Sequence, residues 1–314
     1  MELFKSTTHI NFMKGRKVAI AMSLLVLVLV IVSFFVRGLN LGVDFTGGVI
    51  AEVTYPQAVS AESVRHTLDA AGFKDYTVQN FGSPTDIMVR LRPRADMAAE
   101  GESTAVIKAL EAANPGVREK QTGSVGPQVG GQLRNQGALA LIVALILIFV
   151  YLMVRYEWRL ALGAIAATLH DVVFLVGIFS IMQWEFNLDV LAAVLAVLGY
   201  SVNDTVVVFD RIRENFKRMR RGSALEVINT SINQTLSRTI MTSGMTLLVV
   251  IALLVVGGNA LRGFSLALLI GIIVGTYSSI FIASASAYML GVDRKHFVAK
   301  KRPDAEGAEA EEQS

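Results

Sequence analysis

The sequence contains no cysteine among its 314 residues. This absence excludes a disulfide framework, a thiolate metal site and a cysteine nucleophile, although it fits any cellular compartment. The first apolar run, residues 18–36, also lacks the small-residue cleavage site of a secretory signal peptide and is longer than the apolar core of one. We therefore expect it to remain as an uncleaved first membrane helix.

Two further absences limit the chemistry expected just after this run. The segment 42–48 (GVDFTGG) is not followed by a helix that begins with Lys-Ser or Lys-Thr, so it is expected to form a tight glycine-rich turn rather than a phosphate loop. The longer segment 37–136 has no cluster of histidines and carboxylates, and its isolated His66 is expected on a helix surface. A binding surface is therefore expected in this segment, rather than a catalytic or metal site.

Hydrophobic residues are abundant instead. They make up 53% of the chain, and the mean hydropathy is +0.52, which indicates a polytopic membrane protein. Six apolar stretches are long enough to span a bilayer, at 18–36, 138–154, 160–182, 188–209, 239–257 and 264–290. The expected architecture is an α-helical bundle over 137–290 together with the first helix, flanked by an N-terminal segment 1–17 and a disordered tail at 291–314 that is acidic at its end.

The distribution of Lys and Arg predicts the orientation. Basic residues gather in the N-terminal segment, the 155–159 turn, the connection at 210–236 and the tail, whereas the 183–187 turn has none. By the positive-inside rule both termini are cytoplasmic, and the long segment 37–136 lies outside. The connection 210–236 is expected to be a basic cytoplasmic loop beside anionic lipid, so nucleic acid is not expected as a partner.

The outer segment has a recognisable order of elements. Strands are expected at 49–55, 76–81, 86–92 and 117–125, and helices at 60–72, where Ser60 can act as the N-cap, and at 99–113. The resulting βαββαβ order is that of a ferredoxin-like α+β domain. Gly126 and Pro127 follow the last strand and are expected to form a hinge to the second membrane helix.

The fourth apolar stretch carries the most unusual residue, Asp204, together with Ser201 and Asn203. A carboxylate in hydrocarbon costs on the order of 2.5–3.5 kcal/mol even on the mildest scale, which marks it as a functional candidate. Gly199 belongs to a stripe of small residues on the same helix face as Asn203, with Ala192 and Ala196, where another helix can approach closely. A buried polar residue that merely holds helices together is the alternative interpretation.

Other polar residues within the apolar stretches are candidates as well. Asp171 shares a helix face with Gly163 and Ala167 and is expected to point into the bundle, where His170 and Asp171 either relay protons or fix helix register. Arg238 and Thr242 form one polar stripe. Arg238 is either a snorkelling anchor or an ion-pair partner of Asp204.

These residues suit a machine that couples proton passage to helix rearrangement, because a carboxylate can be neutral in hydrocarbon and ionised in water. Six helices with one outer domain would be half of a pseudo-symmetric assembly, so a partner or second copy must supply the rest. An intramembrane aspartyl protease that uses Asp171 and Asp204 and a passive scaffold are the alternatives from other classes.

The chain resembles the SecD/SecF family of the resistance–nodulation–division (RND) superfamily, and specifically its SecF branch. The motifs that carry the resemblance are GVDFTGG at 42–48, FG at 81–82, DIMVR at 86–90, VGP at 125–127, EWRL at 157–160, HD at 170–171, GYSVNDT at 199–205, FDRIREN at 209–215, RT at 238–239 and TSG at 242–244. The residues of the first motif that the resemblance emphasises are Gly42, Asp44, Phe45, Gly47 and Gly48.

The resemblance implies a function that composition does not show. Members pair with SecD into a twelve-helix unit, which uses the proton-motive force to promote late-stage export of unfolded preproteins across the bacterial cytoplasmic membrane. The implied partners are SecD, the SecYEG translocon, YajC- or YidC-type accessory proteins and the preprotein. Protons take the place of a cofactor, and no enzymatic activity is implied. The resemblance places the proton-responsive carboxylate at Asp204, a needed arginine at Arg238 and a threonine one turn later at Thr242.

Overall fold

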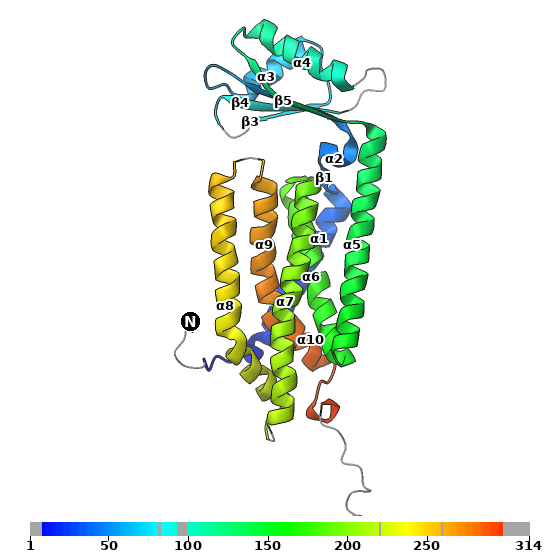
Figure 1. Cartoon of the computed structure of the whole chain (residues 1–314), viewed down its shortest axis with the longest axis vertical. Helices are drawn as coiled ribbons and strands as arrows, with labels where there is room; N and C mark the ends of the chain where they lie inside the picture. Colours follow the sequence, from blue (N-terminus) through cyan, green and yellow to red (C-terminus); the bar gives the residue numbers. More distant parts are fainter. Residues whose placement is uncertain (1–7, 81–82, 93–98, 220, 259, 298–314) are drawn as a thin grey trace, which may run out of the picture.

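The computed structural model describes residues 8–80, 83–92, 99–219, 221–258 and 260–297. A helical bundle forms the larger part, and a small α/β domain is stacked on one end of it (Figure 1). The first and last described residues both lie at the other end of the bundle. The tail expected to be disordered over 291–314 is ordered at its start, where the short 3-10 helix η3 (Arg294–His296) forms and Phe297 stacks on Phe216. Its acidic residues, after 302, lie outside the described residues.

Within the described residues, six helices are long and apolar enough to cross a membrane, which confirms the predicted polytopic architecture. They are α1 (Arg16–Arg37), α5 (Pro127–Arg155), α6 (Trp158–Met182), α7 (Leu188–Arg218), α8 (Ala224–Val256) and α9 (Arg262–Ser278), the last continuing through the π-helical turn η2 (Ser279–Ala283) into α10 (Ser284–Met289). In α6, α7 and α9, at least half of the most apolar stretch is buried inside the protein. The same stretches of α1, α5 and α8 are mostly exposed, so these helices lie at the periphery.

The prediction of a loop over 210–236 is wrong, because helices occupy most of these residues. Helix α7 continues to Arg218 because Ile212 and Phe216 extend its apolar period, and both side chains are buried. Helix α8 begins much earlier than predicted, at a capping box in which Ser223 and Glu226 satisfy each other's backbone N–H groups. The basic residues of this region are therefore carried largely on two helix ends.

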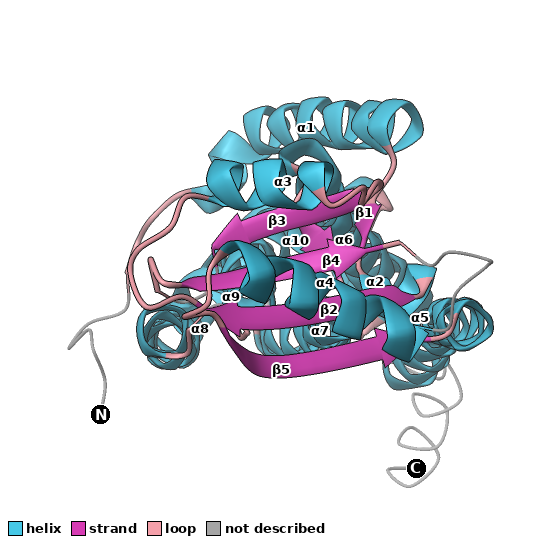
Figure 2. Cartoon of the chain, turned by 90° about the horizontal axis from the view of Figure 1, so that it is seen from above, coloured by secondary structure: helices cyan, strands magenta, loops and turns pink. Residues whose placement is uncertain are grey.

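The outer domain is an antiparallel four-stranded sheet covered by two helices. Strands β2 (Gly48–Thr54), β3 (Tyr76–Asn80), β4 (Asp86–Leu91) and β5 (Arg118–Val125) lie in the order β3-β4-β2-β5. Helices α3 (Ala61–Ala70) and α4 (Ala99–Ala113) cover the sheet face turned away from the bundle (Figures 1 and 2). The predicted βαββαβ order is confirmed, and Ser60 caps α3. Phe81 and Gly82 of the β3–β4 hairpin lie outside the described residues.

The alternation of side chains along the strands explains which sheet face is covered. Val49, Ala51 and Val53 of β2 are buried with residues of α3 and α4, while Ile50 and Glu52 point to the opposite face. The sheet therefore turns its half-polar face towards the membrane bundle.

A short parallel pairing that the sequence did not reveal joins the two parts of the chain. Strand β1 (Asn40–Leu41) pairs with β6 (Glu185–Phe186), which lies between α6 and α7. It is followed by the one-turn helix α2 (Val43–Thr46). The prediction of positive-φ glycines is confirmed at Gly47 and Gly48, whose φ angles are 74° and 139°. It is wrong at Gly42, whose φ is −69°. Gly42 is needed for space instead, because a Cβ there would lie 2.7 Å from Oε1 of Glu185.

Candidate functional site

The glycine-rich segment positions the helix that carries the central carboxylate. Oδ2 of Asp44 accepts a hydrogen bond from the backbone N–H of Leu188, the first residue of α7, at 3.0 Å. Asn187 caps the same helix by accepting from the N–H of Val190. Phe45 is buried beside β6, with its ring stacked on Phe186. The start of α7 is therefore fixed to the junction of the two domains.

Asp204 lies inside the bundle, where three elements meet. Its side chain is on α7 and the residue is 4% exposed. Oδ1 accepts a hydrogen bond of 2.9 Å from Thr239 Oγ1 on α8, and Oδ2 accepts one of 2.8 Å from Ser279 Oγ in η2. A carboxyl group held by two hydroxyl donors can be accommodated with or without its proton, because a hydroxyl can turn to donate or to accept.

Arg238 and Thr242 do not contact this carboxyl group directly. Both residues lie on an exposed part of α8, and the Thr242 hydroxyl donates to backbone carbonyls of its own helix. Among the described residues, no ion pair joins Arg238 to Asp204. The guanidinium is still close enough to attract the carboxylate. The donor from α8 is the neighbouring Thr239, which the sequence showed only as the residue after Arg238.

The small-residue face of α7 looks outward in this chain. Gly199 and Asn203 are exposed, and no atom outside the local helix would lie within 4 Å of a Cβ added at Gly199. Ser201 is buried on the opposite side and donates to Asp171 rather than to Asp204. No other helix of the described chain therefore packs against this stripe of small residues.

Asp171 and His170 are buried on α6, as the spacing with Gly163 and Ala167 predicts. A Cβ at Gly163 would lie 2.8 Å from the carbonyl oxygen of Ala283, so the glycine permits close packing of the last helix. No hydrogen bond joins the described carboxyl groups of Asp171 and Asp204, each of which is bound by different hydroxyls. The shared-proton dyad of an aspartyl protease is therefore not formed.

The junction between β5 and α5 is tightly packed around glycines. Gly126 caps α5, and Pro127 is its first residue. A Cβ at Gly47 would lie 2.7 Å from Cα of Pro127, and one at Gly130 would lie 2.6 Å from the backbone nitrogen of Gly47. The residues expected to form a hinge thus contact the glycine-rich segment, and their movement stays a prediction.

Comparison with known proteins places the chain among protein-export membrane proteins. Residues 105–293 match the family described as "Protein export membrane protein SecD/SecF, C-terminal", and residues 32–59 match the "SecD/SecF GG Motif". The chain is 47% identical over 312 residues to the protein translocase subunit SecF of Vibrio alginolyticus, with 99% of each chain covered. It is 45% identical to the SecF subunit of Escherichia coli O157:H7, with 95% of this chain and 93% of that one covered.

Solved structures agree with these relatives. The crystal structure of SecDF, a translocon-associated membrane protein from Thermus thermophilus, matches with a TM-score of 0.80 and 38% identity over 92% of this chain. This chain covers 39% of that longer one. A second SecDF structure, in a super-membrane-facing form, matches with a TM-score of 0.69 and 35% identity. The chain is thus a multi-pass membrane protein that belongs to the SecD/SecF family, in the branch of the SecF translocase subunits.

Proposed function

We propose that this chain pairs with SecD and uses the proton-motive force to promote late-stage export of unfolded preproteins across the cytoplasmic membrane. Asp204 is the group that binds and releases the proton in this proposal. Both termini lie in the cytoplasm, and the sheet domain lies outside. The SecYEG translocon, and YajC- or YidC-type proteins, would be the further partners.

The observation that carries the proposal is the position of Asp204. It is a buried carboxyl group at the meeting point of α7, α8 and η2, and it is bound by one hydroxyl from each of the last two elements. Addition or loss of a proton changes which of these atoms donates and which accepts. A change of charge at this point therefore acts on three elements at once, which is what coupling to a conformational change requires.

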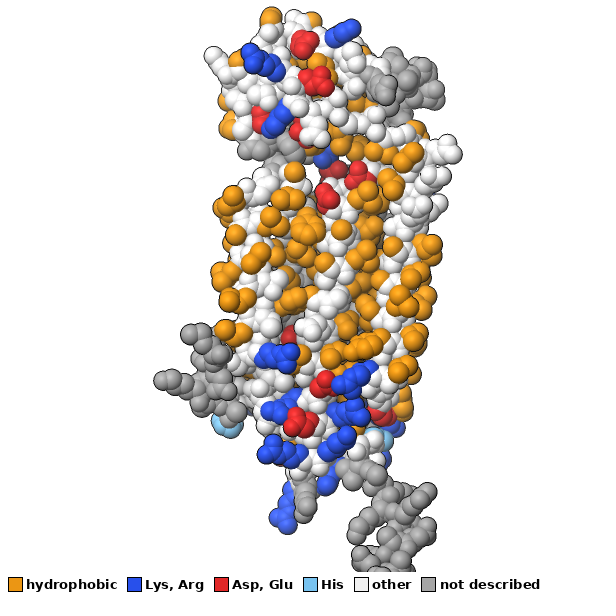
Figure 3. Space-filling view, viewed as in Figure 1, with side chains coloured by type: hydrophobic (Ala, Val, Ile, Leu, Met, Phe, Trp, Pro, Cys, Tyr) orange, Lys and Arg blue, Asp and Glu red, His pale blue; other side chains and the backbone are white. Residues whose placement is uncertain are grey.

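The charge distribution supports the proposed orientation. Lys and Arg side chains gather at the end of the bundle opposite the sheet domain (Figure 3). An excess of basic residues is typical of the cytoplasmic side. The sheet domain is then on the side where an exported polypeptide emerges.

The proposal is tested by export of a preprotein into membrane vesicles that contain this chain with SecD at equal abundance. Asp204→Asn keeps the shape of the side chain but cannot ionise, so we expect the gradient-dependent part of export to disappear. Asp189→Asn is the matched control, because Asp189 is an exposed carboxylate on the same helix. Asp204→Glu retains a titratable group and should retain part of the activity. Unchanged gradient-dependent export in Asp204→Asn would instead favour a passive scaffold.

A further inference from the structure

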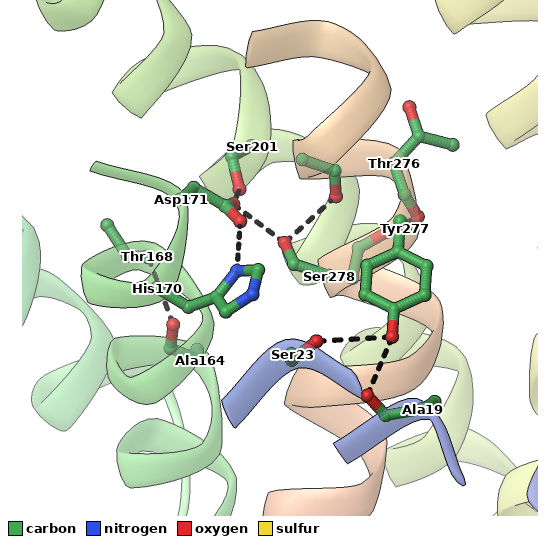
Figure 4. A network of polar contacts seen from close by, with 12 residues as sticks. Ala19, Ser23, Ala164, Thr168, His170, Asp171, Ser201, Thr276, Tyr277 and Ser278 are labelled. Carbon is green, nitrogen blue, oxygen red and sulfur yellow. Dashed lines mark hydrogen bonds and ion pairs between the residues drawn. The ribbon is translucent and has the colours of Figure 1, made fainter. Parts of the chain in front are cut away.

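A second buried carboxyl group lies one helix away from Asp204. Asp171 is 1% exposed and is held by three polar contacts. Oδ2 accepts hydrogen bonds from Ser201 Oγ on α7 at 2.5 Å and from Ser278 Oγ on α9 at 2.6 Å, and Oδ1 lies 2.9 Å from Nδ1 of His170 (Figure 4). The oxygen atoms of this group are therefore fully engaged inside the bundle.

His170 has an unused nitrogen at this site. The residue is 5% exposed, and its Nε2 atom is buried without a hydrogen-bond partner in the part of the chain that the structure describes. The ring lies between Phe174 and Tyr277, with ring centroids 5.7 and 6.5 Å away. A buried polar atom without a hydrogen-bond partner destabilises the folded state and needs an explanation.

The unpartnered Nε2 atom can bind a proton, and this changes the net charge of the His170–Asp171 pair. A neutral imidazole that donates from Nδ1 to an ionised Asp171 leaves the pair with one negative charge. A proton taken from water onto the lone pair of Nε2 forms an N–H bond and makes the pair neutral overall, so the second state places no net charge in the bundle. The proton returns to water when the N–H bond breaks.

Helices α1, α7 and α9 pack against α6 beside the pair. Asp204 is on α7, one turn after Ser201, with Arg238 of α8 beyond it. Tyr277 faces the imidazole from α9, and its hydroxyl contacts Ser23 Oγ and the carbonyl oxygen of Ala19 on α1 at 3.1 and 2.9 Å (Figure 4). Residues 18–36 of α1 include no charged side chain. Asp204 is the acidic residue of α7 that is closest in sequence to Ser201, which contacts the pair.

Two consecutive serines connect the two carboxyl groups. Ser278 donates to Asp171 and Ser279 donates to Asp204, both to Oδ2. They stand where α9 changes into the π-helical turn η2, a local geometry that is frequent at functional sites. A shift of this turn relative to α7 therefore alters the hydrogen bonds of both carboxyl groups together.

We propose that the His170–Asp171 pair is a second proton-binding site, and that Ser278 and Ser279 couple it to Asp204. The inference rests on the proposed function of Asp204 for its meaning in export. The binding of a proton to His170 is a property of the chain that can be measured separately.

Nuclear magnetic resonance of ¹⁵N-histidine in the complex with SecD, in lipid nanodiscs, tests the proposal. The chain has four histidines, so His170→Gln identifies the buried signal by its loss, and His66→Gln is the exposed control. We expect the His170 signal to change from the form with one N–H group to the form with two as the pH is lowered. If the two sites are coupled through the serines, Asp204→Asn should move the midpoint of this change. Ser279→Ala should also move the midpoint, whereas Asp189→Asn should not.

Each other outcome overturns a defined part of the proposal. A His170 signal that keeps one protonation state as the pH is lowered shows that the pair is structural. A signal that titrates identically in wild type, Asp204→Asn and Ser279→Ala shows that the two sites are uncoupled. Export assays with Asp204→Asn decide the proposed function separately, because they do not depend on the state of His170.

Discussion

Asp204 is surrounded by hydroxyl groups rather than by a paired cation. Thr239 and Ser279 supply the two contacts, and Arg238 lies further away on an exposed part of α8. A buried ion pair would hold the carboxyl group in its charged state, because protonation would leave the partner cation buried without a counter-charge. Two hydroxyls stabilise the charge more weakly, which suits a group that has to exchange protons.

Thr239→Val tests the contribution of one of these hydroxyls. Valine has a similar shape and removes the donor to Oδ1 of Asp204. A hydrogen bond to a charged group contributes about 1.5–3 kcal/mol, so we expect gradient-driven export to slow by about tenfold or more. Thr246→Val is the control, because the Thr246 hydroxyl donates only to a backbone carbonyl of α8. Equal export rates in the two variants would contradict the assigned role of Thr239.

The sheet domain contains a carboxyl group with a perturbed pKa at its surface. Asp86 accepts hydrogen bonds from Lys120 Nζ and Thr54 Oγ1, each at 2.8 Å. The bond from Lys120 is the main cause that holds the pKa of Asp86 below its ordinary value of 3.8, with Thr54 and Ser83 contributing. Since the folded-state pKa is lower than the unfolded one, the ionised group stabilises the domain above about pH 4, and this contribution is lost as the pH falls through the folded-state pKa.

Asp86→Asn should therefore destabilise the sheet domain at neutral pH and make little difference in acid. Hydrogen exchange of the β2 and β4 amides in the full chain, between about pH 3 and 7, measures the opening free energy of both proteins. A difference between variant and wild type that stays constant over this range would show that Asp86 acts through packing alone.

At the scale of elements, α7 is the connection between the outer junction and the buried site. Its first residue is bound by Asp44, and Asp204 lies further along the same helix. Above this start lies a cleft of about 460 Å³ between the sheet and the bundle. Arg90 of β4 crosses the junction to form an ion pair with Glu185 of β6, and about four-fifths of each side chain is buried. This ion pair therefore attaches the outer domain to β6, the strand that directly precedes α7.

Loss of one partner of this pair should loosen the attachment of the sheet domain. Removal of one member of a buried ion pair typically costs about 3–5 kcal/mol when the other charge is left uncompensated. Asp44 and Glu52 also attract Arg90, so we expect a smaller cost here. We expect Glu185→Gln to increase hydrogen exchange at β1 and β6, and the double change Arg90→Glu with Glu185→Arg to restore part of the protection. Glu62→Gln, in the exposed pair with Arg65, is the control. Unchanged exchange in Glu185→Gln would show that the pair does not hold the domain.

The elements that the sequence predicted well are those with a strong local pattern. The six apolar helices and the βαββαβ order follow from periodicity, and burial of Asp171 follows from its spacing with Gly163 and Ala167. The parallel pairing of β1 with β6 could not be predicted, because each strand has two residues that are far apart in sequence. The hydroxyl partners of Asp204 depend on the rotation of α8 and on the π-helical turn, which no local pattern showed.

At the scale of the whole molecule, α7 has an exposed stripe of small residues on the helix that carries Asp204. Ala192, Ala196, Gly199 and Asn203 form an exposed stripe on α7, although α7 is otherwise among the most buried helices. Small residues allow close approach of another membrane helix. The solved SecDF relative is more than twice as long as this chain, which covers 39% of it. SecD is therefore the partner that we expect on this face.

Ala196→Leu should disrupt this contact without unfolding the chain. A larger side chain in a tightly packed helix interface typically costs about 1–3 kcal/mol, so we expect co-purification with SecD to fall by about tenfold. Ala140→Leu is the matched control, since Ala140 is exposed on the peripheral helix α5. Equal co-purification of both variants with SecD would place the partner on another face.

The most direct test of the central claim is the proton flux through proteoliposomes that contain this chain, SecD and the translocon during export of a preprotein. A pH-sensitive dye inside the vesicles reports the flux after a proton gradient is imposed. If Asp204 exchanges protons, wild type and Asp189→Asn conduct them, and Asp204→Asn reduces the flux to the level of empty vesicles. A flux in Asp204→Asn equal to that of wild type would contradict the account, because the protons would then cross without this carboxyl group.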